Sequence, residues 1–282
     1  MAPSTAMSSD DAGPRGDVGL FGPESVTWRV QLEPVLWVAG MRALLLQSLH
    51  PRVMRGTYQN SALFDPAKAW PRFQRTVAFV GTRTFGSTDD VDQAASRVRR
   101  LHAGLRGYDP DTGTEFRIDE PAALLWVHCA EIDSYVQIAH RAGVVDDTEA
   151  DIYVAENVRA AEIIGLDPDT VPDSRGALAA YFADARPQLR LCDETRHAVT
   201  GLLRPQRHAP LGAALGLSTI AALALATLPR WARRLYGLPA LPSTDLAVIL
   251  ALRALRTATD LLPDPPAPPE IEHARRLVRA RG

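Results

Sequence analysis

Val91–Gly107 reads VDQAASRVRRLHAGLRG, and this stretch decides the fold class. Its apolar residues recur three and four positions apart, which is the spacing of one face of an α-helix. His102 falls between Val98 and Leu105 on that face, so we expect its ring to point inward. A buried imidazole needs a partner, either a backbone carbonyl in the core or a bound ligand. The full apolar set is Val91, Ala94, Ala95, Val98, Leu101 and Leu105.

A second inward histidine is expected in the next helical stretch, PAALLWVHCAEIDSYVQIAHRAG. Asp119 is a plausible N-cap, Pro121 suits the first turn, and Gly143 is a natural stop. His128 shares the apolar stripe of this helix, which consists of Leu124, Leu125, Ile132, Tyr135, Val136 and Ala139. Two inward histidines on consecutive helices indicate a common buried site that holds a metal or a prosthetic group.

The composition is that of a globular protein without a nucleic-acid or strongly acidic partner. The chain has 282 residues, enough for one large domain, with 46% hydrophobic and 23% charged residues. Its net charge is −2. Cys129 and Cys192 are too few and too far apart for a zinc or CxxC motif, so we expect reduced thiols in the cytoplasm. No signal peptide is predicted at the start of the chain.

The segment before the first histidine is also expected to be largely helical. Glu33–Leu49 is almost continuously apolar and predicts a central helix that stops at His50, because Pro51 follows. We expect His50 to act as a helix cap. Thr57–Pro66 is interpreted as a loop. Trp70–Val80 predicts a further helix, on which one face is shared by Arg72, Arg75 and Thr76.

Later segments complete the all-α prediction. Leu211–Leu228 carries no charge over eighteen residues, near the lower limit for a membrane span. Its glycines and alanines favour a buried helix, and peripheral membrane contact stays open. In Ser243–Leu262, the last core helix, Leu246, Ile249, Leu250 and Leu252 should lie inside. Other helices are expected at 147–164, 174–185 and 188–203, and His197 should be a surface residue.

The predicted domain organisation has three parts. Residues 1–26 are rich in Ser, Asp, Gly and Pro and predict a disordered tail. Residues 27–261 form a single large helical domain. Residues 262–282 comprise a proline-rich linker followed by an arginine-rich, solvated tail.

Several short motifs occur together in a characteristic order. They are ALLLQSLHPRV (43–53), Asn60-Ser61, RFQRT (72–76), RVRRLHAGLRG (97–107), LLWVH (124–128) and WARRLYGLP (231–239). In this order the chain resembles the rubber oxygenase (latex-clearing protein) and MpaB-type oxygenase family over residues 28–260. The resemblance implies an all-α, globin-like domain that holds haem b and activates dioxygen.

The resemblance also implies roles for individual residues. His102 matches the proximal iron ligand, and Arg72 and Thr76 match the arginine and threonine on the distal side. Arg75 stands where rubber oxygenases have a lysine that caps the iron. A guanidinium stays protonated, so Arg75 is expected to donate hydrogen bonds to dioxygen instead. Residues 56–66 also hold no glutamate where the family employs an acid, and both departures concern the cleavage of carbon–carbon double bonds.

Alternatives to this interpretation remain open. His128 competes with His102 as the iron ligand, or bonds to a carbonyl or a haem propionate. A non-haem di-iron oxygenase would need Glu-x-x-His pairs, whereas the chain offers only His128-x-x-Glu131 in reversed order. A non-catalytic haem- or lipid-binding helical protein is a further alternative. In the oxygenase interpretation, the apolar inner faces suit an isoprenoid, terpenoid or acyl substrate.

Overall fold

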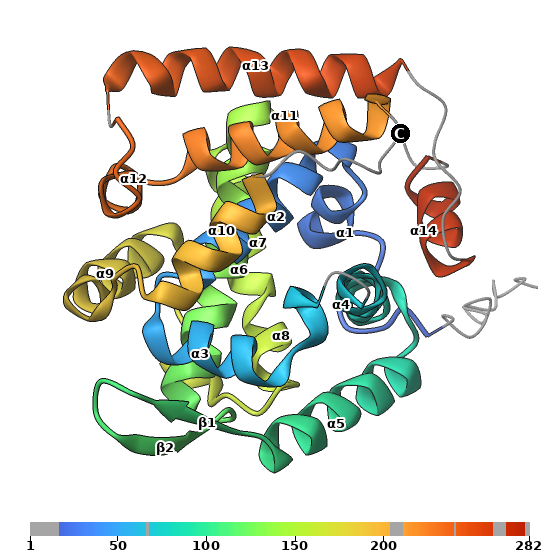
Figure 1. Cartoon of the computed structure of the whole chain (residues 1–282). Coiled ribbons are helices and arrows are strands. Elements are labelled where there is room, and N and C mark those ends of the chain that lie inside the picture. Colours follow the sequence, from blue (N-terminus) through green and yellow to red (C-terminus); the bar gives the residue numbers. More distant parts are fainter. Residues whose placement is uncertain (1–16, 66–67, 204–210, 240, 262–268, 280–282) are drawn as a thin grey trace, which may run out of the picture.

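The computed structural model describes residues 17–65, 68–203, 211–239, 241–261 and 269–279, and it is predominantly α-helical, as predicted (Figure 1). The helices are α1 (Val26–Gln31), α2 (Trp37–Gln47), α3 (Pro51–Asn60), α4 (Ala69–Phe85), α5 (Thr88–Gly104), α6 (Pro121–Ala142), α7 (Asp147–Glu156), α8 (Val158–Glu162), α9 (Arg175–Ala185), α10 (Asp193–Leu203), α11 (Leu211–Thr227), α12 (Arg230–Leu235), α13 (Pro242–Asp260) and α14 (Pro269–Arg279). Short 3₁₀ turns occur at Pro34–Leu36, Ala62–Phe64, Pro168–Thr170 and Arg186–Gln188.

Helix α6 is the centre of the molecule, and its ends follow from its sequence. Pro121 occupies the first turn, and Gly143 ends the helix with a left-handed φ of 75°. Both boundaries confirm the prediction. The N-cap is Glu120 rather than Asp119, because the Asp119 carboxylate pairs with Arg117 at 2.6 Å. Helices α2, α7, α9 and α13 pack around α6.

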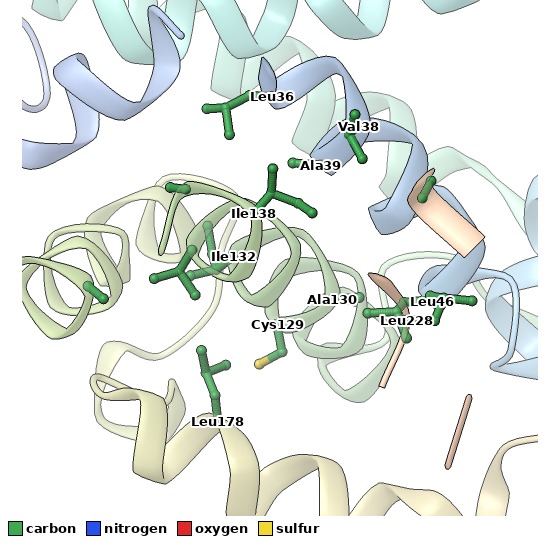
Figure 2. Close-up of a cluster of buried hydrophobic side chains, with 14 of the residues drawn as sticks. Leu36, Val38, Ala39, Leu46, Cys129, Ala130, Ile132, Ile138, Leu178 and Leu228 are labelled. Carbon is green, nitrogen blue, oxygen red and sulfur yellow. The ribbon is translucent and has the colours of Figure 1, made fainter. Parts of the chain in front are cut away.

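The main hydrophobic core lies between α6 and its neighbours. Figure 2 shows Ile132 and Ile138 on α6, with Leu46 of α2 and Leu178 of α9 approaching from different sides. All four side chains are buried. The regularly spaced apolar residues of α6 therefore pack in the core over most of the length of the helix. A polar side chain among them needs a polar partner.

Two stretches differ from the sequence prediction. The expected loop at 57–66 begins with the last turn of α3, because His50 accepts a hydrogen bond from the Val53 amide at 3.4 Å and Pro51 occupies the first helical position. His50 is thus a cap, but of the helix that follows it rather than of the helix that it was expected to end. The predicted turn at 108–113 joins two short strands, β1 (Arg106–Asp109) and β2 (Thr114–Arg117), which pair antiparallel. This hairpin was not predicted.

Three predicted core leucines lie on the surface. Leu101 of α5 is 57% exposed, and Leu246 and Leu250 of α13 are 64% and 60% exposed. Only one face of α13 packs on the protein, through Val248 and Leu252. The leucine spacing correctly predicted a helix, but it did not reveal which face is covered. His197 is exposed, as predicted.

The described parts of both terminal segments pack on the domain. Asp17 accepts hydrogen bonds from the backbone and side chain of Thr88, and Phe21 contacts the cluster around Trp28. Helix α14 buries Ala274 against the same cluster. The expectation of a solvated tail is therefore wrong for 269–279. This segment is an amphipathic helix, and its apolar face packs against the cluster around Trp28. Residues 1–16 and 262–268 lie outside the described residues.

The first turn of helix α1 is capped by a carboxylate that is distant in the sequence. Glu156, at the end of α7, accepts hydrogen bonds from the Val26 and Thr27 amides at 3.2 and 2.8 Å and from the Thr27 hydroxyl at 2.7 Å. These amides belong to the unsatisfied first turn of the helix. The Trp28 indole donates to the Thr84 carbonyl of α4 at 2.7 Å. A helix of only six residues is thus held by α4, α7 and α14.

Among the described residues, the helices lack the combination of length and apolarity that crossing a membrane requires. The predicted buried helix at 211–228 corresponds to α11, which packs against α2 and α13.

Candidate functional site

Helix α4 carries the arginine–threonine motif on one face. Arg72, Thr76, Val80 and Arg83 follow each other at intervals of four, four and three residues, so they lie along a single stripe. The Arg72 guanidinium donates a hydrogen bond to the Thr76 hydroxyl at 2.7 Å. Arg72 is half-buried, and burial together with the charge of Arg75 lowers its pKa. Thr76, which is exposed, accepts from Arg72, and its hydroxyl donates to the Arg72 carbonyl at 3.5 Å.

Helix α5 presents His102 beside this face. Ser87 caps the helix by accepting a hydrogen bond from the Asp90 amide, as expected of a serine at an N-cap. The His102 ring is half-buried, and burial is the main cause that lowers its pKa. Asp119 raises the pKa, whereas the positive charge of Arg72 lowers it further. Burial thus favours the neutral imidazole, which is the form that binds metals. Two motifs thirty residues apart in sequence thus act on each other in the fold.

The region around His102 is packed more openly than the core. No residue is fully buried in the described parts of 72–80 or 96–105, although both contain large apolar side chains. The half-buried apolar residues are Phe73, Val77, Phe79, Val80, Val98 and Leu105. Monomeric proteins cover most contiguous apolar surface. The α4 and α5 faces therefore offer an apolar surface that a flat prosthetic group could cover.

The end of α5 is fixed by the hairpin that follows it. The Gln59 side chain of α3 donates to the Tyr108 carbonyl at 2.9 Å and accepts from the Tyr108 amide at 2.8 Å. Asn60 donates to the Arg106 carbonyl at 2.8 Å, and Arg55 forms a buried ion pair with Asp109. These contacts position β1, and β1 holds the last turn of α5, which carries His102.

His128 lies in a different setting. It is 4% exposed, and burial lowers its pKa to about 4. Its nearest charged neighbours are Glu131, which raises the pKa, and Arg83, which lowers it. Arg83 binds both carboxylate oxygens of Glu131, at 2.6 and 3.4 Å.

The structure brings some predicted site residues together and leaves others apart. Arg72 bonds to Thr76, and its charge lowers the pKa of His102. His128 responds to Glu131 and Arg83 rather than to Arg72. Arg75 is exposed and makes no ion pair with Asp89 or Asp90 in the described chain. The sequence reasoning missed Arg83, although its spacing from Arg72 and Thr76 on α4 could have indicated it.

The side chains of the described residues limit how a metal ion could be bound here. They contain no group of three or more His, Cys, Asp or Glu side chains that could hold an ion. Iron held at His102 would therefore need its other ligands from elsewhere, as a porphyrin supplies them. The site defines an all-α protein with a neutral, half-buried histidine beside an arginine–threonine pair.

Comparison with known families agrees with this class. The model of the catalytic domain of the ER-bound oxygenase mpaB/B′ and rubber oxygenase matches residues 28–260. The chain belongs to this oxygenase family, which confirms the resemblance found in the sequence. Searches among curated proteins and among solved structures gave no match.

Proposed function

We propose that this protein is a haem-dependent oxygenase that uses dioxygen to oxidise an apolar small molecule. The observation that carries the proposal is the match of residues 28–260 to the oxygenase family, whose arginine–threonine and histidine motifs lie on two helices that pack together, α4 and α5. Haem b, when bound, would supply the activation of dioxygen. The half-buried apolar faces of α4 and α5 fit a porphyrin.

In this proposal His102 holds the haem iron through its neutral imidazole. The lowered pKa of His102 favours the neutral ring, whose nitrogen can bind iron. Gln59 and Asn60 hold the backbone of Tyr108 and Arg106, just after the helix that carries His102. His128 is the weaker ligand candidate, because its ring lies deep beside the Arg83–Glu131 pair.

Arg72, Thr76 and Arg75 are proposed to act on the reacting oxygen. The hydrogen bond from Arg72 to Thr76 holds the guanidinium in place, and its remaining N–H groups would act on the oxygen. Arg75 has no carboxylate partner in the described chain and adds positive charge beside Arg72. Because a guanidinium does not release its proton, Arg75 would leave the iron uncapped.

Apolar inner faces support a substrate of the isoprenoid, terpenoid or acyl class. Carbon–carbon double-bond cleavage remains one outcome that product analysis can reveal. Water would be excluded from the site by the aromatic and aliphatic side chains of α4, such as Phe73 and Val77.

The proposal is tested by expressing the protein with a haem precursor and recording its absorption spectrum. Wild-type protein should show a Soret band, and His102→Ala should lose it while retaining its far-ultraviolet circular dichroism. His197→Ala, which changes an exposed histidine on α10, is the matched control and should keep the band. Arg72→Ala should keep haem and lower oxygen consumption by on the order of a hundredfold. A wild-type protein without haem, or a band lost in His128→Ala but not in His102→Ala, contradicts the proposal.

A further inference from the structure

The outer face of α13 carries a row of exposed, mostly apolar side chains. They follow each other at intervals of four, four, three and four residues, so they lie on one side of the helix. This row, called the leucine stripe below, consists of Leu246, Leu250, Ala254, Thr257 and Leu261. Each of its three leucines is at least 60% exposed. With a rise of about 1.5 Å per residue, the stripe is about 22 Å long.

The exposure of large apolar side chains is concentrated in this part of the molecule. Of the ten that are strongly exposed in the described chain, five lie between Leu235 and Leu261. The opposite face of α13 is buried in the main core through Val248 and Leu252. Figure 1 shows α13 along one edge of the molecule, so its outer face is directed away from the rest of the fold. A contiguous exposed apolar surface of this kind marks a site of contact.

The segment that contains α12 and α13 is positively charged. Residues 230–261 contain five arginines and two aspartates, although the net charge of the whole chain is −2. Asp245 binds Arg230 and Arg233 at 2.9 and 2.7 Å, and it thereby neutralises only part of this charge. An anionic surface attracts a segment with such an excess of arginine.

Two arginines of this segment are free to bind an anionic partner. Arg234 and Arg253 are exposed and form no ion pair in the described chain. Arg253 follows Leu250 after three residues and precedes Thr257 by four, so it borders the leucine stripe. Helix α11, which packs against α13, adds no charged residue. Exposed leucines and unpaired cations therefore occur together on this side of the molecule.

The residue types of the stripe favour a lipid surface over a protein partner. The residues that dominate protein interfaces are mainly aromatic residues and arginine, whereas leucine is under-represented among them. Helix α13 contains no aromatic residue and no methionine. A helix that lies in the plane of a membrane surface instead directs leucines toward the acyl chains and arginines toward the headgroups. The long side chain of Arg253 can reach a headgroup from the edge of the stripe.

We propose that the outer face of α13 binds the surface of an anionic lipid bilayer, with the helix parallel to the bilayer plane. The leucines of the stripe enter the boundary between headgroups and acyl chains, and Arg234 and Arg253 bind lipid phosphates. This contact is independent of haem and of the proposed oxygenase function. It brings that function to the phase in which apolar substrates accumulate.

The test is flotation of the full chain with lipid vesicles. Vesicles of equal parts of phosphatidylcholine and phosphatidylglycerol are compared with vesicles of phosphatidylcholine alone. Wild-type protein should bind the anionic vesicles at least about tenfold more tightly, because two arginines lie near the lipid surface. Leu246→Ser/Leu250→Ser should lower binding to the anionic vesicles by at least about tenfold. Arg234→Gln/Arg253→Gln should remove most of the preference for the anionic vesicles.

Each variant has a matched control on another surface. Leu101→Ser/Ile152→Ser changes two exposed apolar residues on α5 and α7, and it should bind vesicles as wild type does. Arg97→Gln/Arg100→Gln removes two exposed charges from α5 and should retain the preference for the anionic vesicles. Circular dichroism identifies a variant that fails to fold, and the other α13 variant then decides the result.

Three outcomes would overturn the proposal. Wild-type protein could fail to float with the anionic vesicles, or the two α13 variants could bind as wild type does. A loss of binding in the controls that equals the loss in the α13 variants would show that the contact is not specific to α13. Sedimentation equilibrium tests a second copy as the occupant. A dimer that Leu246→Ser/Leu250→Ser separates, in a protein that binds no vesicles, would assign the face to that copy. The Soret band, recorded on the same samples, tests the haem proposal separately.

Discussion

The two histidines that the sequence placed on apolar helix faces lie in opposite kinds of packing. His128 belongs to α6, which is covered on most sides and whose polar groups are enclosed by protein. His102 belongs to α5, at the edge of the molecule, where apolar side chains are only half-buried (Figure 1). Both rings have a lowered pKa, since desolvation acts on each. The comparison shows that a lowered histidine pKa indicates only that the ring is buried. The half-buried apolar side chains around His102 indicate where a large group could bind.

The largest effect should come from breaking the ion pair in the closed region. Arg83→Ala leaves the Glu131 carboxylate enclosed without its partner, and we expect a loss of about 3–5 kcal/mol in the free energy of unfolding. Urea denaturation measures it. Lys68→Ala, which breaks an exposed pair with Asp65, is the control and should cost less than about 1 kcal/mol. Equal losses in both variants would contradict the contrast between the two regions.

A somewhat smaller effect should appear in the dependence of stability on pH. The folded-state pKa of His128, about 4, is below its unfolded value near 6.5, so the unfolded chain binds the proton more readily. The contribution is complete above pH 6.5 and is lost as the pH falls toward 4, by about 3 kcal/mol. Denaturation at several pH values should show a shallower loss for His128→Phe than for wild type. His197→Phe is the surface control, and a wild-type slope in His128→Phe would refute the assignment.

The smallest effect concerns the open region. Arg72→Ala removes a positive charge that lowers the pKa of His102, so this pKa should rise. Nuclear magnetic resonance titration of the imidazole protons, on protein prepared without haem, measures the change. Unfolding free energy should stay within about 0.5 kcal/mol, because Arg72 is not in the packed core. An unchanged His102 titration would show that the two motifs are not coupled.

The sequence predicted features that depend on local chemistry. Pro121 and Gly143 marked the ends of α6 correctly, and the spacing of Arg72 and Thr76 correctly placed them on one face. The sequence did not show that Leu246 and Leu250 would face outward, because periodicity defines a face but not its neighbour. Globin-like details, the boundaries of the domain and the roles of the site residues stay predictions.

Features built from distant residues could not be read from local patterns. The hairpin depends on Gln59 and Asn60, which bind its backbone from α3 across more than forty residues. The Arg83–Glu131 pair joins helices that are separated by the hairpin and by α5. Helical spacing within one segment does not show which residues of two different helices will pair. Arg83 does, however, lie on the same face of α4 as Arg72 and Thr76.

Because Glu156 caps α1, the time at which α1 becomes stable during synthesis depends on residues that are added much later. A six-residue helix cannot persist on its own in water, since nucleation costs more than so few hydrogen bonds return. Its first amides are bound only when residue 156 has been synthesised, and its cover by α14 comes with residues 269–279. Helix α1 is thus synthesised well before the segments that stabilise it. Until then Trp28 stays accessible to chaperones, and its fluorescence would report the packing of α14.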